Sequence, residues 1–497
     1  MQYNFAVNKL IGAQAMSEFN YTPEWVKNAV FYQIFPDRFA HSKFVVQPDN
    51  METWDSPPTV HGFKGGDLLG VYEKLDYLQD LGINAIYFNP IFQSASNHRY
   101  HTHDYYLIDP LLGGRQAFDT LLTEAHRRNI RIVLDGVFNH ASRGFFQFNH
   151  ILECGEKSPY LNWFDVRGYP LHAYEGHPNY RCWWNSPALP EFNTDHPQVR
   201  QYIFDVARYW VEQGIDGWRL DVPFDIDDDE FWRDFRTVVK KANPDAYIVG
   251  EIPCEAQRWM KGDMFDAVMN YQFTLACLTF FGGKDTDFKL AEGMMGFHSF
   301  PSLDAEHFLI RTNELLHLYP YEFSLAQLNL LDSHDMPRFL SLVRGDTATF
   351  KLATLFQMTY PGAPCVYYGD EIGLTGGKDP GCRKSFPWEE EKWDVALRSD
   401  VKTLISFRNQ HSALRTGDFI PLYGGNHVIA YCRKDQTETI IVIINNSTAN
   451  VTLDIDMKRN VPSQTNLKDL LTGKDLVVEN GWLPKVNIPA KSGVILI

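Results

Sequence analysis

The sequence predicts an α/β protein: a (β/α)8, or TIM, barrel with a subdomain inserted after its third strand and a C-terminal antiparallel β-sandwich. Short apolar runs alternate with amphipathic helical stretches through most of the chain, as strands and helices do in such a barrel. One long segment rich in aromatic residues, Pro, Gly and Asn interrupts this alternation. Near the end of the chain, apolar residues recur at every second position, which is typical of antiparallel strands.

The barrel is predicted over residues 29–413. Its first strand, within AVFYQIFPDRF, ends at Pro36, and the helical stretch DLLGVYEKLDYLQDLG leads into the second strand, INAIYFNP. Further helices are expected over 117–128, 198–213 and 230–242, and each leads into another strand. The predicted strands begin at Ala29, Ile83, Arg131, Gly217, Ala246, Phe265, Ser324 and Gly362.

Three segments lie outside this alternation. Residues 1–28 carry no strong period, and we expect an arm packed on the outside of the barrel. Residues 141–189 show no helical period; because loops of that length in compact domains are usually functional, we expect a small subdomain that overhangs the site. Residues 414–497 include NVTLDIDM, in which apolar and polar residues alternate, and predict a separate β-domain.

Composition restricts the partners of this chain. Its 46 basic and 62 acidic residues give a formal charge of −16, which argues against nucleic acid or an anionic membrane and is compatible with a neutral ligand. No apolar stretch has the length of a membrane span, and the N-terminal residues lack the apolar core of a secretory signal. Seven cysteines at irregular spacing form no disulfide framework. We therefore expect a cytoplasmic protein, and its oligomeric state is left open.

Four acidic residues are predicted at the carboxyl ends of barrel strands: Asp135, Asp221, Glu251 and Asp335. In a (β/α)8 barrel these ends form the rim that carries the active site. A single acid there can simply cap the next helix, and an isolated pair such as Arg219 and Asp221 is more often a structural ion pair. Four acids together form a costly anionic cluster, which favours a catalytic site.

The surroundings of these acids predict different roles for two of them. Arg219 and Asp221 lie on one face of their strand, so the guanidinium is expected to lower the pKa of Asp221 and keep it ionised. Glu251 follows the apolar run YIVG, where desolvation is expected to raise its pKa toward that of a general acid. One ionised and one protonated carboxyl are what cleavage of a glycosidic bond needs. His140 and His334 are expected to hydrogen-bond sugar hydroxyls.

Four segments, in order along the chain, resemble the signature regions of the α-amylase family of glycoside hydrolases: DGVFNH (135–140), GWRLDVPFD (217–225), VGEIP (249–253) and LLDSHD (330–335). Three more resemble the cyclomaltodextrinase, neopullulanase and maltogenic amylase branch: LPEFN (189–193), VFYQIFPDRF (30–39) and GCRKSFPW (381–388). The resemblance covers nearly the whole chain from about Ala29, and no counterpart of the branch's usual N-terminal domain is expected. It implies a retaining hydrolase of α-1,4-glucosidic bonds in maltooligosaccharides and cyclodextrins, with an α-glucan oligosaccharide as substrate.

The resemblance also implies roles for individual residues. Asp221 matches the nucleophile, Glu251 the acid/base, and Asp335 the carboxylate that binds ring hydroxyls and distorts the substrate. Tyr100 matches a tyrosine that stacks on the sugar being cleaved. The matched substrate-binding positions are Tyr100, His140, Arg219, His334, Asp379 and Arg383, and the supporting positions are Asp135 and Asn139.

Two stretches depart from the branch's pattern on the leaving-group side of the site. Residues 223–225 are Pro-Phe-Asp where Ala-Asn-Glu is common, and residues 253–254 are Pro-Cys where Trp-His is common. The preferred substrate and the balance between hydrolysis and transglycosylation therefore stay open. An α-glucosidase or α-glucan transglycosylase on the same scaffold is an alternative, and a carbohydrate-binding protein without catalysis is a remote one.

No cofactor is expected to be required. Relatives often bind a structural calcium in the loop after the first strand, but here AHSKFVVQPDN supplies His, Lys and apolar side chains, leaving Asp67 and Asn139 as candidate ligands. Because the reaction itself needs only carboxylates, we expect catalysis without a metal and weak calcium binding at most.

Overall fold

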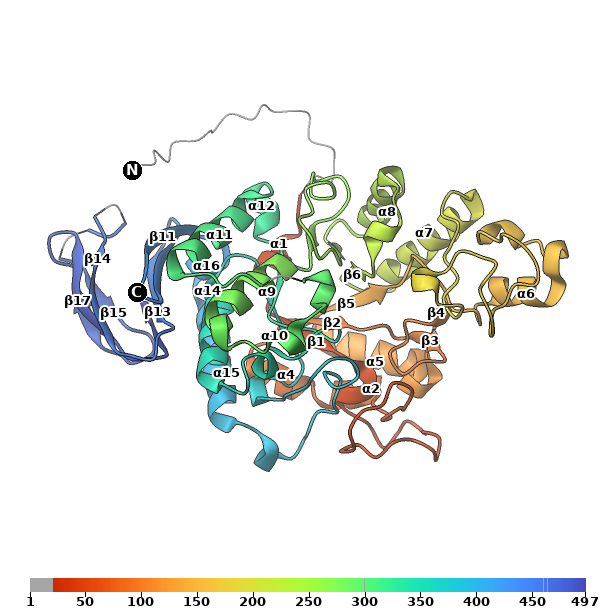
Figure 1. Ribbon diagram of the computed structural model, residues 1–497, viewed down its shortest axis with the longest axis horizontal. Helices are drawn as coiled ribbons and strands as arrows, with labels where there is room; N and C mark the ends of the chain where they lie inside the picture. The colour runs from red at the N-terminus through yellow and green to blue at the C-terminus, as the bar shows by residue number, and fades with distance from the viewer. Residues whose placement is uncertain (1–20, 299, 459, 463) are drawn as a thin grey trace.

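The computed structural model describes residues 21–497 except 299, 459 and 463 (Figure 1). Of the arm predicted over 1–28, only 21–28 are among the described residues, and they contain helix α1 (Glu24–Lys27). The central sheet has eight strands: β1 (Phe31–Ile34), β2 (Ala85–Phe88), β5 (Arg131–Gly136), β6 (Gly217–Leu220), β7 (Tyr247–Gly250), β8 (Ala267–Val268), β9 (Leu328–Leu330) and β10 (Ala363–Tyr367).

These strands form the predicted barrel, and the fold class is confirmed. They pair in parallel in the order β8-β7-β6-β5-β2-β1-β10-β9, and a parallel bridge between Met269 and Leu328 closes the ring. The closing seam between β8 and β9 is short, and side-chain amides take part in it. Gln327 Oε1 accepts a hydrogen bond from Val268 N (3.2 Å), and Asn270 Nδ2 donates to Asn329 Oδ1 (2.8 Å).

Helices surround the barrel, as their amphipathic sequences require. The longer ones are α3 (Leu68–Glu73), α4 (Leu75–Leu81), α5 (Gly114–Arg127), α7 (Pro197–Glu212), α8 (Asp229–Ala242), α9 (Tyr271–Cys277), α11 (Ala305–His317), α14 (Thr347–Thr359) and α15 (Val395–Gln410). The helix expected before the second strand is two helices that meet at Lys74. Helix α8 begins at a capping carboxylate, because Asp228 accepts hydrogen bonds from the backbone of Glu230 and Phe231.

The segment after β5 projects from one end of the molecule (Figure 1). It contains helix α6 (Phe146–Cys154), which the absence of a helical period within 141–189 did not indicate. Phe148 and Ile151 bury one face of this helix, which is too short for its period to stand out in an aromatic-rich sequence. The returning chain pairs with the segment that follows β5, since His140 and Glu191 form an antiparallel bridge. The insert is thus attached directly to the rim of the barrel.

The C-terminal strands lie at the opposite end of the molecule (Figure 1). One antiparallel sheet contains β11 (Asp418–Gly425), β12 (Val428–Lys434), β13 (Thr439–Asn445) and β18 (Ser492–Leu496), and two antiparallel pairs contain β14 (Val451–Asp456) with β17 (Trp482–Ile488) and β15 (Asn466–Lys468) with β16 (Asp475–Val477). Their facing side chains form a second hydrophobic core. The predicted boundary at 414 falls inside helix α16 (Ser412–Thr416).

Two fully buried arginines, Arg408 and Arg433, lie where the barrel meets the C-terminal domain. Arg408 Nη1 donates to the carbonyls of Met358 (3.1 Å), Tyr360 (3.1 Å) and Leu414 (3.0 Å). Arg433 Nη1 also donates to Leu414 O (2.8 Å), and further bonds reach Thr359 O and Gly417 O. Several of these carbonyls belong to the C-terminal ends of α14 and α16, where a cation is favourable.

Candidate active site

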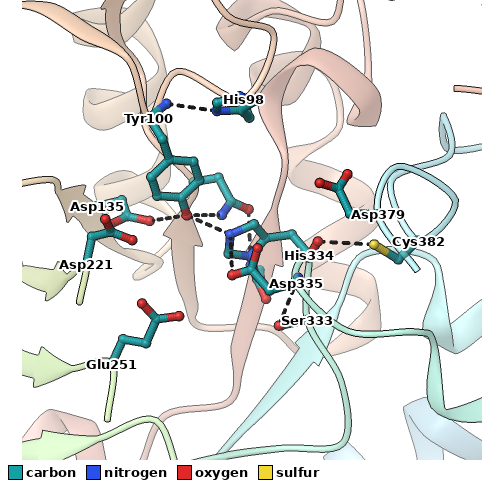
Figure 2. Close-up of polar contacts among 12 residues, drawn as sticks. His98, Tyr100, Asp135, Asp221, Glu251, Ser333, His334, Asp335, Asp379 and Cys382 are labelled. Carbon is teal, nitrogen blue, oxygen red and sulfur yellow. Dashed lines mark hydrogen bonds and ion pairs between the residues drawn. The ribbon is translucent and has the colours of Figure 1, made fainter. Parts of the chain in front are cut away.

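The four predicted acids lie at the carboxyl rim of the barrel. Asp135 is in β5, Asp221 directly follows β6, Glu251 directly follows β7, and Asp335 lies in the segment after β9. Figure 2 shows the carboxyl groups of Asp221 and Glu251 at the ends of neighbouring strands, with Asp335 facing them from across the barrel. Neighbouring parallel strands end at one level, which is why residues far apart in the sequence meet here.

Arg219, on β6, links three of these carboxylates. Its Nη1 lies 2.9 and 3.0 Å from the two carboxylate oxygens of Asp135 and 2.9 Å from Asp221 Oδ1. Its Nη2 lies 2.6 Å from Glu251 Oε1. Glu251 Oε2 also accepts a hydrogen bond from the backbone N of Val222 (3.1 Å). Two candidate catalytic carboxyls are therefore fixed by one guanidinium.

The prediction that Arg219 lowers the pKa of Asp221 below its ordinary value is wrong. Burial raises the pKa of the Asp221 carboxyl well above its ordinary value; Arg219 lowers it, but the negative charges of Glu251 and Asp135 act with burial. Because one guanidinium serves three acids, it cannot hold Asp221 at a low pKa. Burial likewise raises the pKa of Glu251, against the effect of Arg219, in the expected direction.

Asp335 lies in a different electrostatic environment. Burial acts to raise its pKa, but contact with His334 and the charge of Arg383 outweigh burial and hold the pKa well below its ordinary value. Asp335 Oδ2 lies 2.9 Å from His334 Nε2, and Oδ1 accepts from Arg383 Nη2 (3.0 Å). Arg383 Nη1 lies 3.1 Å from Asp379 Oδ1, and half of the Asp379 side chain is exposed. Asp379 and Arg383 thus form the outer edge of the site beside Asp335.

Tyr100 joins the two halves of the site. Its hydroxyl donates to Asp135 Oδ2 (2.8 Å) and lies 2.7 Å from His334 Nε2, and its ring stacks on His334 with planes 6° apart. His334 Nδ1 lies 2.9 Å from Gln33 Nε2, so both ring nitrogens of His334 have protein partners. Tyr100 lies in the loop between β3 (Phe92–Ser94) and β4 (Thr102–Ile108).

His140 contrasts with His334. It is buried, and its Nε2 has no hydrogen-bond partner among the residues that the structure describes. Burial, with the charge of His101, lowers the pKa of His140 to about 3, so the ring is neutral at physiological pH. Its Nδ1 lies 3.4 Å from Asn139 Nδ2, and Asn139 O accepts from Phe192 N (3.0 Å). Asn139 therefore anchors the end of the insert next to His140.

Three further residues contact the site and were not predicted from the sequence. Tyr271 donates to Glu251 Oε1 (3.3 Å), Tyr87 donates to Asp135 Oδ2 (3.0 Å), and the ring of Trp183 stacks on His140. The sequence held a signal for two of them, because Tyr87 lies in the second predicted strand, INAIYFNP, and Tyr271 is the last residue of the sixth, FDAVMNY. Trp183 is in the aromatic insert, where the sequence gives no indication of which rings face the site.

Asp67 is one of the two residues that the sequence leaves as candidate calcium ligands. Both carboxylate oxygens of Asp67 are already engaged: Oδ2 accepts from Ser42 N (2.7 Å), and Oδ1 caps α3 by accepting from Gly70 N (2.7 Å). Over residues 21–497, apart from the three left out, no group of three or more His, Cys, Asp or Glu side chains could hold a metal ion. Within the same residues, no helix is long and apolar enough to cross a membrane.

Comparison with known proteins places this geometry in a family. The family described as "Alpha amylase, catalytic domain" matches residues 33–416, and "Cyclo-malto-dextrinase C-terminal domain" matches 418–497. A cyclomaltodextrinase from Bacillus sp is 47% identical over 435 residues, which are 87% of this chain and 75% of that protein. The crystal structure of Ttha1563 from Thermus thermophilus matches with a TM-score of 0.92 and 46% identity, over 95% of this chain and 99% of the other. The native debranching enzyme of Nostoc punctiforme matches with a TM-score of 0.87 and 47% identity, over 96% and 99%. The chain belongs to the α-amylase family of glycoside hydrolases.

Proposed function

We propose that this enzyme cleaves α-1,4-glucosidic bonds of maltooligosaccharides and cyclodextrins with retention of configuration. The observation that carries the proposal is the grouping of Asp221 and Glu251 on one guanidinium, with Asp335 facing them. Two carboxyls beside one bond suit a double displacement, in which one attacks and the other transfers a proton. The cyclomaltodextrinase and debranching enzyme to which the chain is similar support a glucan substrate.

In the first step, Asp221 attacks the anomeric carbon while Glu251 protonates the leaving glycosidic oxygen. Because its pKa is raised, Glu251 retains the proton that it donates in this step. Its carboxyl is held in place by the backbone N of Val222 and by Arg219. Attack requires ionised Asp221, whose anion is stabilised by the hydrogen bond from Arg219 Nη1. The products of this step are a glucosyl ester of Asp221, Glu251 as the anion, and a leaving sugar.

In the second step, Glu251 takes a proton from water, which attacks the ester and restores both carboxyls. Asp335, held ionised by His334 and Arg383, is placed to accept hydrogen bonds from ring hydroxyls in both steps. If a sugar hydroxyl replaces water, the same intermediate gives transglycosylation. An α-glucosidase or a transglycosylase would therefore use the same residues.

We further propose that catalysis requires no metal and takes place in the cytoplasm. The engaged oxygens of Asp67 support the first statement, because both of them already accept hydrogen bonds from backbone N–H groups. Seven free cysteines, five of them buried, support a reducing compartment.

One product profile tests the proposal. The purified enzyme is given β-cyclodextrin, maltotriose, pullulan and soluble starch, and early products are identified by chromatography and by the NMR signal of the new anomeric centre. We expect α-configured products and higher kcat/KM on the cyclodextrin or maltotriose than on starch. Pullulan is included because it contains α-1,6 bonds, and the similar Nostoc protein is named a debranching enzyme. Early β-configured products, or activity on starch alone, would contradict the proposal.

A further inference from the structure

The insert carries a stack of three rings that begins at the candidate site. His140 stacks on Trp183, with ring centroids 5.1 Å apart and planes 18° apart, and Trp183 stacks on Trp184 at 4.7 Å and 11°. His140 is buried, Trp183 is partly buried, and Trp184 is 83% exposed. The stack therefore leads from the buried ring of His140 to the solvent.

Trp183 is held firmly in this stack. Its Nε1 donates to Asp225 Oδ2 (2.8 Å), in the short helical turn Pro223–Asp225 that follows the candidate nucleophile. A bridge between Cys182 and Pro190 closes the loop that carries both tryptophans. The hydrogen bond from Trp183 to Asp225 thus ties the insert to the leaving-group side of the site, at one of the positions where the sequence departs from the pattern of the branch it resembles.

The backbone of Trp184 is strained. Its backbone lies in the left-handed region (φ 48°, ψ 31°), which is rare for a bulky residue and costs conformational energy. Asn185, which follows, also has a positive φ of 56°. Exposure of an indole to water adds a further cost. Strain at an exposed aromatic ring that is backed by a second ring suggests that a ligand uses the ring.

We infer that Trp184 is a stacking platform for a glucosyl unit of the substrate chain, beyond the two units joined by the bond that is cleaved. The inference rests on the proposed function, because it takes its ligand from there. Trp183 stacks on His140 and on Trp184, so its ring is already in contact with two others. The exposed ring of Trp184, at the end of the stack, is the one that can bind a ligand. A pyranose face presents C–H groups, which lose contact with water when they lie on an indole. Trp183 and Asp225 act through Trp184 as positioning residues.

Substitution of Trp184 tests the platform. Trp184→Asn removes the ring but suits the left-handed backbone, and Trp184→Tyr keeps a ring at the same place. We expect Trp184→Asn to lower kcat/KM for maltohexaose about tenfold, mainly through KM, with a smaller effect on maltotriose. Trp184→Tyr should stay within about twofold of the parent for maltohexaose.

The matched control is Phe146→Ala. Phe146 is another exposed aromatic residue of the insert (62%), and its ring contacts are to His150 and Tyr160 rather than to the stack. This variant should leave both substrates unaffected. Calorimetry in an Asp221→Asn background gives the Kd of maltohexaose without turnover, and Trp184→Asn should raise it by a similar factor.

Two results would overturn the inference, and they differ. If the parent hydrolyses α-glucans but Trp184→Asn leaves the maltohexaose KM and Kd unchanged, the platform is wrong and the proposed function stands. If the parent neither binds nor hydrolyses any α-glucan, the proposed function fails, and the platform fails with it.

Discussion

The protein buries arginines in two places and compensates their charge in opposite ways. At the rim of the barrel, Arg219 contacts three carboxylates, two of which have raised pKa values. At the junction with the C-terminal domain, Arg408 and Arg433 bind backbone carbonyls and, among the described residues, form no ion pair. Burial and the charges of nearby arginines lower the pKa of Arg408 well below its ordinary value.

The difference separates chemistry from architecture. Carbonyls at helix ends accept a buried cation without introducing any group that titrates, so the junction serves stability alone. The rim instead crowds acids around one cation, which is costly for stability but leaves protons available for transfer. We therefore expect the arginine at the rim, which contacts carboxylates, to affect activity and its pH dependence. We expect the arginines at the junction, which bind carbonyls, to affect the stability of the fold.

The largest expected effect is on turnover. Asp221→Asn keeps the size of the side chain but cannot form the glucosyl ester, so we expect kcat to fall roughly 10⁴-fold or more. Circular dichroism and the urea midpoint should stay close to those of the parent. If near-normal activity remained, the nucleophile would have to be another residue of the rim.

Removal of the rim cation should destabilise the protein in a pH-dependent way. Arg219→Met leaves three buried carboxyls without their cation, and we expect a loss of about 3–5 kcal/mol in the free energy of unfolding at pH 7. Without Arg219 the folded-state pKa values rise further above their unfolded values, so the penalty is small below about pH 4 and grows as pH rises. Urea unfolding of parent and variant at pH 5, 6, 7 and 8 measures this. A gap that stayed constant with pH would contradict it.

The same change at the junction should act on stability alone. Arg433→Met leaves the carbonyls of Thr359, Leu414 and Gly417 without these donors, and we expect a loss of roughly 2–4 kcal/mol. Because no carboxylate is involved, the loss should be the same from pH 5 to 8. Measured on the folded fraction, kcat/KM should match that of the parent. A large fall in kcat/KM would show that the two regions are coupled.

The pH dependence of activity should reflect the titration of Glu251. Glu251 must be protonated to act as an acid, and its pKa is raised mainly by burial, so kcat/KM should fall about tenfold per pH unit above that pKa. In Glu251→Gln this basic limb should disappear. A substrate with an acidic phenol as leaving group needs no protonation and should be the least affected by the variant. If the limb persisted in Glu251→Gln, it would belong to another group.

The smallest expected effect is that of calcium. Asp67 represents a third kind of compensation, because this buried carboxylate is satisfied by backbone N–H groups. We expect the melting temperature and kcat to be unchanged by dialysis against EDTA or by millimolar calcium chloride. A calcium-dependent rise of several degrees that is lost in Asp67→Asn would show that a metal competes for these oxygens.

Much of this architecture was predictable because it depends on local patterns. The apolar runs placed all eight strands, and their ends placed Asp135, Asp221 and Glu251 together. The pKa of Asp221 was not predictable from its neighbour Arg219, because the sequence cannot show that Asp135 and Glu251 share the same guanidinium. Helix α6 and the partners of Trp183 depend on tertiary packing in the insert, which periodicity does not report.

The seam of the barrel has a consequence for motion. Strand β8 is only Ala267–Val268, and side chains of Gln327 and Asn270 replace part of the backbone ladder toward β9. A seam with few backbone bonds opens with less free energy than the other strand pairs, so its amides should exchange with solvent deuterium earliest in the barrel. Tyr271 follows this seam directly and donates to Glu251. We therefore expect that opening of this seam displaces the Tyr271 hydroxyl from the Glu251 carboxyl, which supplies the proton.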